Sequence, residues 1–356
     1  MGIEFWTMGA GRPGGPDSEV FDGVRQAVRA EEVGYAGIVY VDSQNGVGDC
    51  YIAMALAAHA TSTIKLGTGV TNSFTRHPAV TASAIATVQV ESGGRAYLGI
   101  GRGDSALAHL GRAPHSVTAF EDYLVRLQGY LRGEEVPFEG GGAIASLGLA
   151  DYSGSSRIIW IANDQPKVPV DVAATGPRVI AAADRHADRV SLNVGADVER
   201  IRWGVEVARS ARVEAGLSPE IPFSAYVSLV VHDDPEEAMR IGAGQVSLFA
   251  RFSAMYGTVV GPTSAGQREV LQGIHAAYDM QRHGRGSGPQ EEAVTAEFAR
   301  DFGIFGPPSY CADRLSELID LGVDRFVFRG SPLDPDNPDS RAAERFVQEV
   351  VPLLRD

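Results

Sequence analysis

Two aspartates, Asp42 and Asp104, are the residues best placed to do chemistry, because each closely follows an apolar run. Asp42 comes directly after YAGIVYV at residues 35–41, and Asp104 follows AYLGI at residues 96–100 after a Gly-Arg-Gly turn. A carboxylate at such a position can act as a general acid when a water-poor pocket raises its pKa. Either aspartate can instead cap the segment that follows it. The sequence leaves both interpretations open for both residues.

Glycine and small polar residues follow two further apolar runs, where they predict close approach of a ligand. The run at residues 64–70 leads into Thr71-Asn72, and the run at 168–173 leads into Ala174-Thr175-Gly176-Pro177. Proline at this position begins a helix. The free N–H groups and dipole of a helix N-terminus attract an anion. A plain strand–helix turn explains the same residues without a ligand.

Alternating strands and helices must position these polar segments. Continuous apolar runs predict buried parallel strands, and apolar residues at helical spacing predict amphipathic helices. The predicted strands are residues 3–7, 35–41, 64–70, 96–100, 168–173, 187–192, 223–231 and 325–328. The predicted helices are one capped by Asp17 or Ser18 and those at 51–60, 78–90, 117–132, 178–185, 198–215, 308–321 and 341–354. All the polar segments then lie at the carboxyl ends of strands, where α/β folds bind ligands.

Eight such units predict a single (β/α)8 barrel, a TIM barrel of the α/β class, over residues 1–356. Turn-rich and helical stretches predict insertions at about 133–165, after the fourth strand, and 235–305, after the seventh. Residues 158–161 are expected to form one strand of a small hairpin in the first insertion. An open doubly wound sheet is the alternative, but it lacks a dinucleotide fingerprint after the first strand.

Composition excludes several classes of function. The net charge is -14, so the chain has no excess of Lys and Arg for a phosphate backbone, and we expect no nucleic-acid partner. No apolar stretch approaches about 18 residues, so we expect neither a signal peptide nor a membrane span. Two cysteines far apart, Cys50 and Cys311, predict buried thiols in a reducing, cytoplasmic compartment. The histidines lack metal-ligand spacing, so no metal site is expected.

The segment IKLGTGVTNSFTRHPAVTASAIATVQVESGGRAYLGIGRGDSA, at residues 64–106, resembles the bacterial luciferase-like superfamily. It resembles most closely the coenzyme F420-dependent branch, which contains methylenetetrahydromethanopterin reductase and F420-dependent glucose-6-phosphate dehydrogenase. VPVDVAATGPRVIAAADRHADRV and the late GVDRFVFRG agree with this branch. The resemblance covers about residues 1–330 and is weakest in the two insertions, where substrate contacts would lie.

The resemblance implies an F420-dependent oxidoreductase that transfers hydride between the deazaflavin C5 and a small organic substrate. It implies a non-prolyl cis peptide at Gly69-Val70 under the ring, a proton donor at Asp104, and Asp42 near the ring. Ser43 stands where some relatives carry a catalytic histidine, which argues against sugar-phosphate dehydrogenase activity. The implied catalytic residues are Asp104 and Asp42, and the implied cofactor-binding residues are Asp42, Gly69, Val70, Thr71, Asn72, Gly101, Ala174, Thr175, Gly176, Pro177, Asn193, Val194 and Gly195.

The resemblance also leaves alternatives open. FMN could replace F420 in a luciferase-like monooxygenase, or the protein could bind a flavin without catalysis. Relatives are mostly dimers that pair through their early helices, so a homodimer is expected. His77 could contact cofactor or substrate or could be purely structural, and Arg282 or Arg285 could meet the acidic tail of F420.

Overall fold

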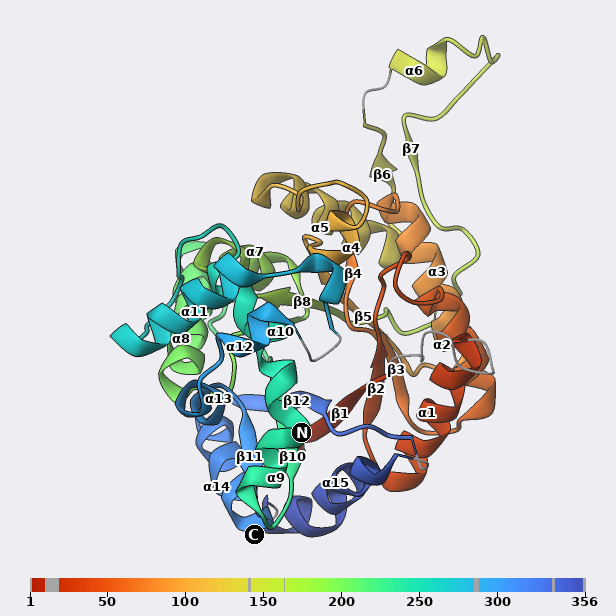
Figure 1. The fold of residues 1–356 in the computed structure, drawn as a ribbon. Coiled ribbons are helices and arrows are strands. Elements are labelled where there is room, and N and C mark those ends of the chain that lie inside the picture. The colour runs from red at the N-terminus through yellow and green to blue at the C-terminus, as the bar shows by residue number, and fades with distance from the viewer. Residues whose placement is uncertain are drawn as a thin grey trace.

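Eight parallel strands close into a barrel in a computed structural model that describes residues 2–9, 19–139, 142–162, 164–284, 288–334 and 337–354 (Figure 1). Neighbouring strands pair in chain order, and the pairing of the eighth barrel strand with the first completes the circle. The barrel strands are β1 (Glu4–Gly9), β2 (Gly37–Tyr40), β3 (Lys65–Thr68), β5 (Ala96–Gly101), β8 (Val170–Ala174), β9 (Arg189–Leu192), β10 (Phe223–Val231) and β12 (Val323–Gly330). The predicted TIM barrel is therefore confirmed, and the open sheet is excluded.

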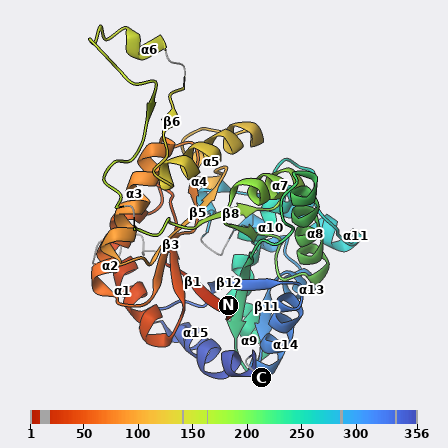
Figure 2. The same cartoon turned by 180° about the vertical axis from the view of Figure 1, so that it is seen from behind.

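Helices cover the outside of the barrel between successive strands (Figures 1 and 2). They are α1 (Glu19–Val33), α2 (Cys50–Ala60), α3 (Pro78–Glu91), α5 (Val117–Leu131), α7 (Pro177–His186), α8 (Val198–Glu214), α14 (Pro308–Ile319) and α15 (Arg341–Arg345). A π-helical segment (Phe346–Val350) and a 3-10 segment (Val351–Leu354) continue α15. The predicted cap at Asp17 or Ser18 lies outside the described residues. Within the described residues, no helix is long and apolar enough to cross a membrane.

The barrel interior is filled by aromatic and charged side chains below its carboxyl end. Trp6 and Tyr97 meet edge to face with their ring centroids 5.0 Å apart, and the Arg325 guanidinium lies 4.5 Å from the Trp6 ring. Asp171 accepts hydrogen bonds from the hydroxyls of Tyr97 and Ser224. This packing confines open space to the end of the barrel where the strands terminate.

The first insertion forms an arm that projects away from the barrel (Figures 1 and 2). It contains α6 (Gly142–Ala145) and a two-stranded antiparallel ribbon of β6 (Val136–Pro137) and β7 (Ser155–Ser156). The prediction of a hairpin strand at residues 158–161 is wrong. Val136 already pairs with Ser156, so a partner for residues 158–161 would have to come from the turn that ends α5.

The second insertion is mainly helical, as predicted, and packs over the carboxyl end of the barrel. Its elements are α9 (Pro235–Gly242), α10 (Val246–Ala250), α11 (Ala265–Ala277), a 3-10 turn (Met280–Arg282), α12 (Pro289–Glu292) and α13 (Ala296–Phe302). The short strand β11 (Ile304–Gly306) pairs in parallel with β10, outside the barrel circle. Sequence patterning did not predict this strand, which has only three residues.

Candidate active site

A cavity of about 710 Å³ opens at the carboxyl ends of the barrel strands. Ten of the predicted site residues line it: Asp42, Gly69, Val70, Thr71, Asn72, Gly101, Asp104, Thr175, Gly176 and Asn193. They come from loops after five strands that are distant in sequence, β2, β3, β5, β8 and β9. The barrel therefore brings together segments that the sequence could only place individually at strand ends.

Four predicted residues do not line the cavity. The side chains of Ala174 and Val194 are buried in the core between the strands and the outer helices. Pro177 begins α7 on the exposed side, and Gly195 lies against the ring of Phe302. Successive side chains of a strand point to opposite faces, and on β8 it is Ala173 that lines the cavity. Ala174 therefore faces away from the cavity, and its prediction as a site residue is wrong.

The backbone after β3 forms one wall of the cavity. The Gly69-Val70 peptide bond is cis, as the resemblance implied. A Cβ on Gly69 would lie only 2.4 Å from Val39 Cγ2, so this position requires glycine. The two-residue strand β4 (Thr71–Asn72) then pairs with the end of β5. The loop is thereby fixed against the neighbouring strand.

Asn72 holds the turn after β4 and leaves one polar group for a ligand. Its Oδ1 accepts hydrogen bonds from the backbone N–H groups of Phe74 and Thr75, at 3.0 and 2.9 Å. Its Nδ2 is buried, and no partner for it is found within the described residues. A buried donor without a partner is costly, so it marks a place for an acceptor on a ligand.

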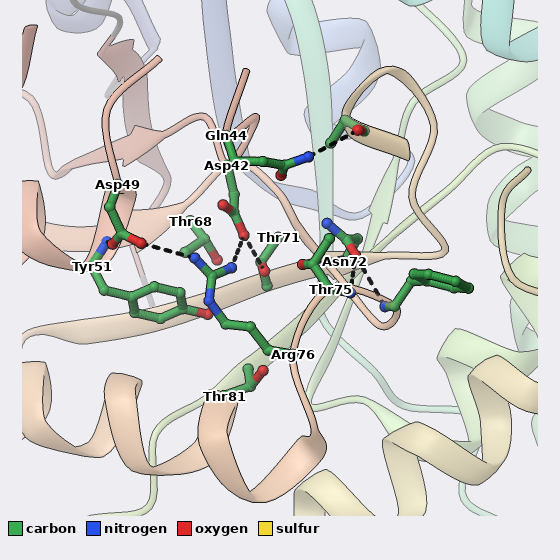
Figure 3. Close-up of polar contacts among 12 residues, drawn as sticks. Asp42, Gln44, Asp49, Tyr51, Thr68, Thr71, Asn72, Thr75, Arg76 and Thr81 are labelled. Carbon is green, nitrogen blue, oxygen red and sulfur yellow. Dashed lines mark hydrogen bonds and ion pairs between the residues drawn. The ribbon is translucent and has the colours of Figure 1, made fainter. Parts of the chain in front are cut away.

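Asp42 is fixed by an arginine that approaches from outside the cavity (Figure 3). Arg76 donates from Nη1 to Asp42 Oδ2 at 2.5 Å and from Nη2 to Asp49 Oδ2 at 3.0 Å. The Thr71 hydroxyl donates to the same Asp42 oxygen at 2.6 Å, and the Arg76 guanidinium lies 4.8 Å from the Tyr51 ring centroid. Asp42 therefore fixes the loop after β3, and no capping bond from its side chain to the following segment is found within the described residues.

Asp104 lies in a buried position opposite a residue of the second insertion. Gly103 has φ 87°, a conformation that favours glycine, and it turns the chain so that Asp104 lines the cavity. Arg251 Nη2 donates to Asp104 Oδ1 at 2.6 Å, whereas Oδ2 is buried and has no partner among the described residues. Asp104 precedes α4 (Ser105–Ala108) but makes no side-chain capping bond, so the structural alternative is not realised.

Opposing effects act on the Asp104 carboxyl group. Burial raises its pKa, and the positive charge of Arg251 lowers it, with a net increase. Arg251 is itself positioned by the Tyr278 ring, whose centroid lies 4.2 Å from the guanidinium carbon. Sequence reasoning missed Arg251, because 147 residues separate it from Asp104 and the insertion has no pattern that singles it out.

The N-terminus of α7 is open toward the cavity. Gly176 occupies its N-cap position with no side-chain capping bond, and a Cβ there would meet nothing within 4 Å. Thr175 Oγ1 donates to the Asn193 carbonyl at 3.0 Å, which joins the loops after β8 and β9. Asn193 Oδ1 is buried without a partner in the described part of the chain. The open helix N-terminus suits a bound phosphate group, whereas the Asn193 oxygen would accept from a donor on the ligand.

The second insertion supplies an apolar wall facing these loops. Leu248, Phe249, Phe252, Met255 and Met280 line the cavity from this side. His283 and Arg329, which the sequence analysis did not select, add polar groups to the same wall. Within the described residues, no group of His, Cys, Asp or Glu side chains could hold a metal ion.

The remaining candidates lie outside the cavity wall or outside the described residues. His77 caps α3 by accepting a hydrogen bond from the Ala79 N–H at 3.2 Å. This is the purely structural role that the sequence analysis gave as one of two possibilities. Arg282 has a half-exposed side chain whose Nε lies 3.9 Å from Asp279. Arg285 is outside the described residues.

Comparison with known proteins agrees with this geometry. The sequence profile of luciferase-like monooxygenases matches residues 1–325. Two proteins named 5,10-methylenetetrahydromethanopterin reductase are similar. The one from Methanolobus tindarius is 28% identical over 94% of this chain and 97% of its own length. The one from Methanopyrus kandleri is 30% identical over 85% of this chain and 86% of its own.

A solved structure is similar over the whole chain. It is the coenzyme F420-dependent tetrahydromethanopterin reductase of Methanopyrus kandleri, with a TM-score of 0.75 and 25% sequence identity. The likeness covers 99% of this chain and 99% of that one. Because the family profile spans almost the entire barrel, the chain belongs to the luciferase-like monooxygenase family.

Proposed function

We propose that this protein is an F420-dependent oxidoreductase acting on a small organic substrate. The observation that carries the proposal is that one cavity combines the Gly69-Val70 surface, the buried Asp104 carboxyl and the open N-terminus of α7. The Gly69-Val70 surface would support a ring, the Asp104 carboxyl group could transfer a proton, and the N-terminus of α7 could bind a phosphate. The similar solved reductase uses F420, which supports this cofactor over others.

The residues present fit the deazaflavin and its phosphate. Asn72 lines the cavity where the ring would lie, and its Nδ2, which has no partner among the described residues, needs an acceptor. The backbone N–H groups of the first turn of α7 would hold the phosphate, with Thr175 and Asn193 beside them. Gly69, Val70, Thr71 and Gly101 would support the ring. Bound F420 would supply the hydride chemistry, as cofactors do in such enzymes.

Asp104 is the residue we assign to proton transfer. Its carboxyl group lines the cavity, and burial raises its pKa in spite of Arg251. A raised pKa favours the protonated form that a donor needs. Asp42 shares its oxygen between Arg76 and Thr71, so we assign it to positioning the loop that supports the ring.

Titration of the purified protein with F420 and with FMN tests the cofactor assignment. We expect saturable binding of F420 at micromolar or lower concentration and much weaker binding of FMN. A Gly176→Asp variant places a negative charge at the α7 N-terminus and should weaken F420 binding by at least about tenfold. Gly266→Asp is the matched control, because a Cβ at Gly266 also meets nothing within 4 Å and no described residue of α11 lines the cavity.

Three outcomes separate the possible functions. Tight FMN binding without F420 binding would replace our proposal with an FMN-dependent monooxygenase. Tight F420 binding without turnover across a panel of alcohols, aldehydes and imines would indicate a non-catalytic flavin-binding protein. F420 binding with turnover of any member supports the proposed function.

We also propose that the protein is a homodimer that pairs through α2 and α3. These helices pack together, and Ile52, Leu56, Val80 and Val90 remain between 42% and 57% exposed on them. Sedimentation velocity should give a dimer, and Leu56→Asp should give a monomer. Val125→Asp is the control, because Val125 is an exposed apolar residue on α5 instead.

A further inference from the structure

In the described part of the chain, the acidic residues of the cavity wall have charged partners, whereas its arginines do not. Asp42 and Asp104 line the wall, and each is neutralised by an arginine behind it, Arg76 or Arg251. Arg102 and Arg329 also line the wall. Their hydrogen-bond partners are neutral, and no carboxylate among the described residues pairs with either. Among the described residues of the wall, the two aspartates are therefore paired with arginines, whereas Arg102 and Arg329 have no carboxylate partner.

Arg102 and Arg329 differ in position. Arg102 lies at the mouth, where it donates from Nε to the His115 carbonyl at 2.6 Å and from Nη2 to the Tyr256 hydroxyl at 2.8 Å. Tyr256 is 66% exposed, so this arginine is at the solvent boundary. Arg329 lies inside, at the end of β12, and donates from Nε to Gln245 Oε1 at 2.7 Å. Its Nη2 also donates to the Gly284 carbonyl at 3.4 Å, and no partner for Nη1 is found within the described residues.

The groups around Arg329 do not neutralise it. His283 accepts or donates at Nδ1 to the Tyr278 hydroxyl at 2.7 Å. Burial and the neighbouring arginines lower the pKa of His283 to about 3, so the imidazole is neutral near pH 7. Burial likewise lowers the pKa of Arg329 to about 10, which leaves it charged at that pH. Arg251 is already committed to Asp104.

Arg329 is also separate from the proposed phosphate site. The open N-terminus of α7 follows β8 and Asp104 follows β5, whereas Arg329 is near the end of β12, across the barrel from both strands. Arg329 and Asp104 instead flank the same segment of the second insertion, because Gly284 contacts Arg329 and Tyr278 contacts the partner of Asp104. A molecule that meets both residues would lie along the insertion wall.

We propose that Arg329 binds an oxyanion group of the substrate, a carboxylate or a phosphate, while the reacting carbon lies near Asp104. A planar guanidinium with free donors matches either group through paired hydrogen bonds. This inference rests on the proposed function for the identity of the reacting centre, and it narrows the substrate class to organic anions. Leu248, Phe249 and Met280 would contact the apolar part of the molecule between the two ends.

Calorimetric titration with inorganic phosphate and with propionate, on the cofactor-free protein and on protein saturated with F420, tests the proposal. Saturation with F420 occupies the phosphate site at α7, so binding that persists reports a second anion site. We expect Arg329→Gln to weaken that binding by about tenfold or more, because a charged hydrogen-bonding partner is lost. Arg329→Lys keeps the charge and should retain part of the affinity. The probe that binds more tightly identifies the carboxylate or the phosphate as the substrate group.

Arg102→Gln is the matched control, since it removes the other wall arginine that has neutral partners. Loss of anion binding in Arg102→Gln but not in Arg329→Gln would overturn the assignment, as would equal anion binding in wild type and both Arg329 variants. F420 affinity, measured on every variant, reports whether the barrel remains folded. If wild type fails to bind F420 but its anion binding still depends on Arg329, the cofactor proposal falls and the anion site stands.

Discussion

At the scale of single residues, the two aspartates that follow apolar strands have different environments. Asp42 shares one oxygen between Arg76 and Thr71, whereas one oxygen of Asp104 has no partner among the described residues. Both positions could be selected from the sequence, because a carboxylate directly after a buried strand lies at the functional edge of a barrel. The different roles of the two aspartates could not be predicted from the sequence, because they depend on arginines contributed from elsewhere in the chain.

Replacing Asp104 by asparagine tests its assignment. Asp104→Asn keeps the size of the side chain but removes the transferable proton, so turnover should fall by at least about a hundredfold. F420 affinity should stay within a few-fold, because Asp104 is not assigned to cofactor binding. Stopped-flow measurement of hydride transfer and a binding titration check the two parts. Turnover close to wild type would contradict the assignment.

Arg251 should set the pH range in which Asp104 can donate. Burial raises the pKa of Asp104 and Arg251 lowers it, so Arg251→Met should raise this pKa further. The protonated form then persists to higher pH, and the falling limb of the pH–rate profile in the direction of proton donation should move upward. Arg251→Lys retains the charge and should leave the limb near its wild-type position. An unchanged profile in Arg251→Met would exclude electrostatic coupling of the pair.

At the scale of elements, buried charges also affect how tightly the outer helices pack. Asp184 on α7 is fully buried, and its Oδ1 is 3.9 Å from Arg212 Nη1 on α8. Burial raises the pKa of Asp184 to about 6, against the lowering effects of Arg212 and Arg185. Protonation therefore favours the folded state, and this contribution is lost as the pH rises through about 6.

Asp184→Asn should accordingly stabilise the protein at pH 8 but have little effect near pH 4. A shift of this size corresponds to at most about 3 kcal/mol in the free energy of unfolding. Urea denaturation at the two pH values measures the difference. Asp313→Asn on α14 is the control, because Asp313 is exposed and should change stability little at either pH. A uniform effect of Asp184→Asn across pH would contradict the prediction.

The arm should be dispensable for the stability of the barrel. Its residues Leu147 and Leu149 are 66% and 52% exposed, and the ribbon at its base is closed by the bond from Phe138 N to the Gly154 carbonyl at 2.9 Å. Replacing residues 139–153 by an Asn-Gly turn keeps β6 and β7 and shortens the loop. The free energy of unfolding in urea should change by less than about 1 kcal/mol. A larger loss would mean that the arm packs against another part of the molecule.

The elements with strong apolar patterning could be predicted, and the weakly patterned ones could not. All eight barrel strands were expected near their observed positions because buried parallel strands are continuous apolar runs. The β6–β7 ribbon was misplaced because Ser155 and Ser156 have no apolar pattern and pair through their backbone. For the site, strand-end residues such as Thr71 and Thr175 were found. Arg251 lies within the second insertion and Arg329 contacts it, so the positions of both depend on how that insertion folds.

At the scale of the whole molecule, the barrel confines one cavity above a filled interior. Trp6, Tyr97 and Arg325 occupy the space below it, so a ligand reaches the site only from the end covered by the second insertion. The chain is strongly acidic, yet two arginines of the cavity wall, Arg102 and Arg329, have no carboxylate partner among the described residues. Anionic ligands are therefore favoured inside the cavity by these two arginines and not by the overall charge of the protein.

Ligand binding to the folded barrel should raise the free energy of unfolding of the whole protein. A molecule that binds only the folded state at a hundred times its Kd adds about 2.7 kcal/mol to the free energy of unfolding. F420 at that concentration should therefore raise the Tm by several degrees, and FMN at the same concentration should not. Thermal unfolding followed by circular dichroism measures both shifts. Equal shifts for the two compounds would contradict the cofactor assignment.

The contact between Asp104 and Arg251 has a consequence for how the substrate range of this protein can change. Arg251 belongs to the insertion that lines the cavity, and its charge lowers the pKa of Asp104 on the opposite loop. Reshaping that insertion for a new molecule, by natural drift or by directed evolution, therefore alters proton affinity at the same time. With Asp104 as the proposed proton donor, specificity and working pH would change together. Variants selected for one trait will need compensating changes around Tyr278 to keep the other.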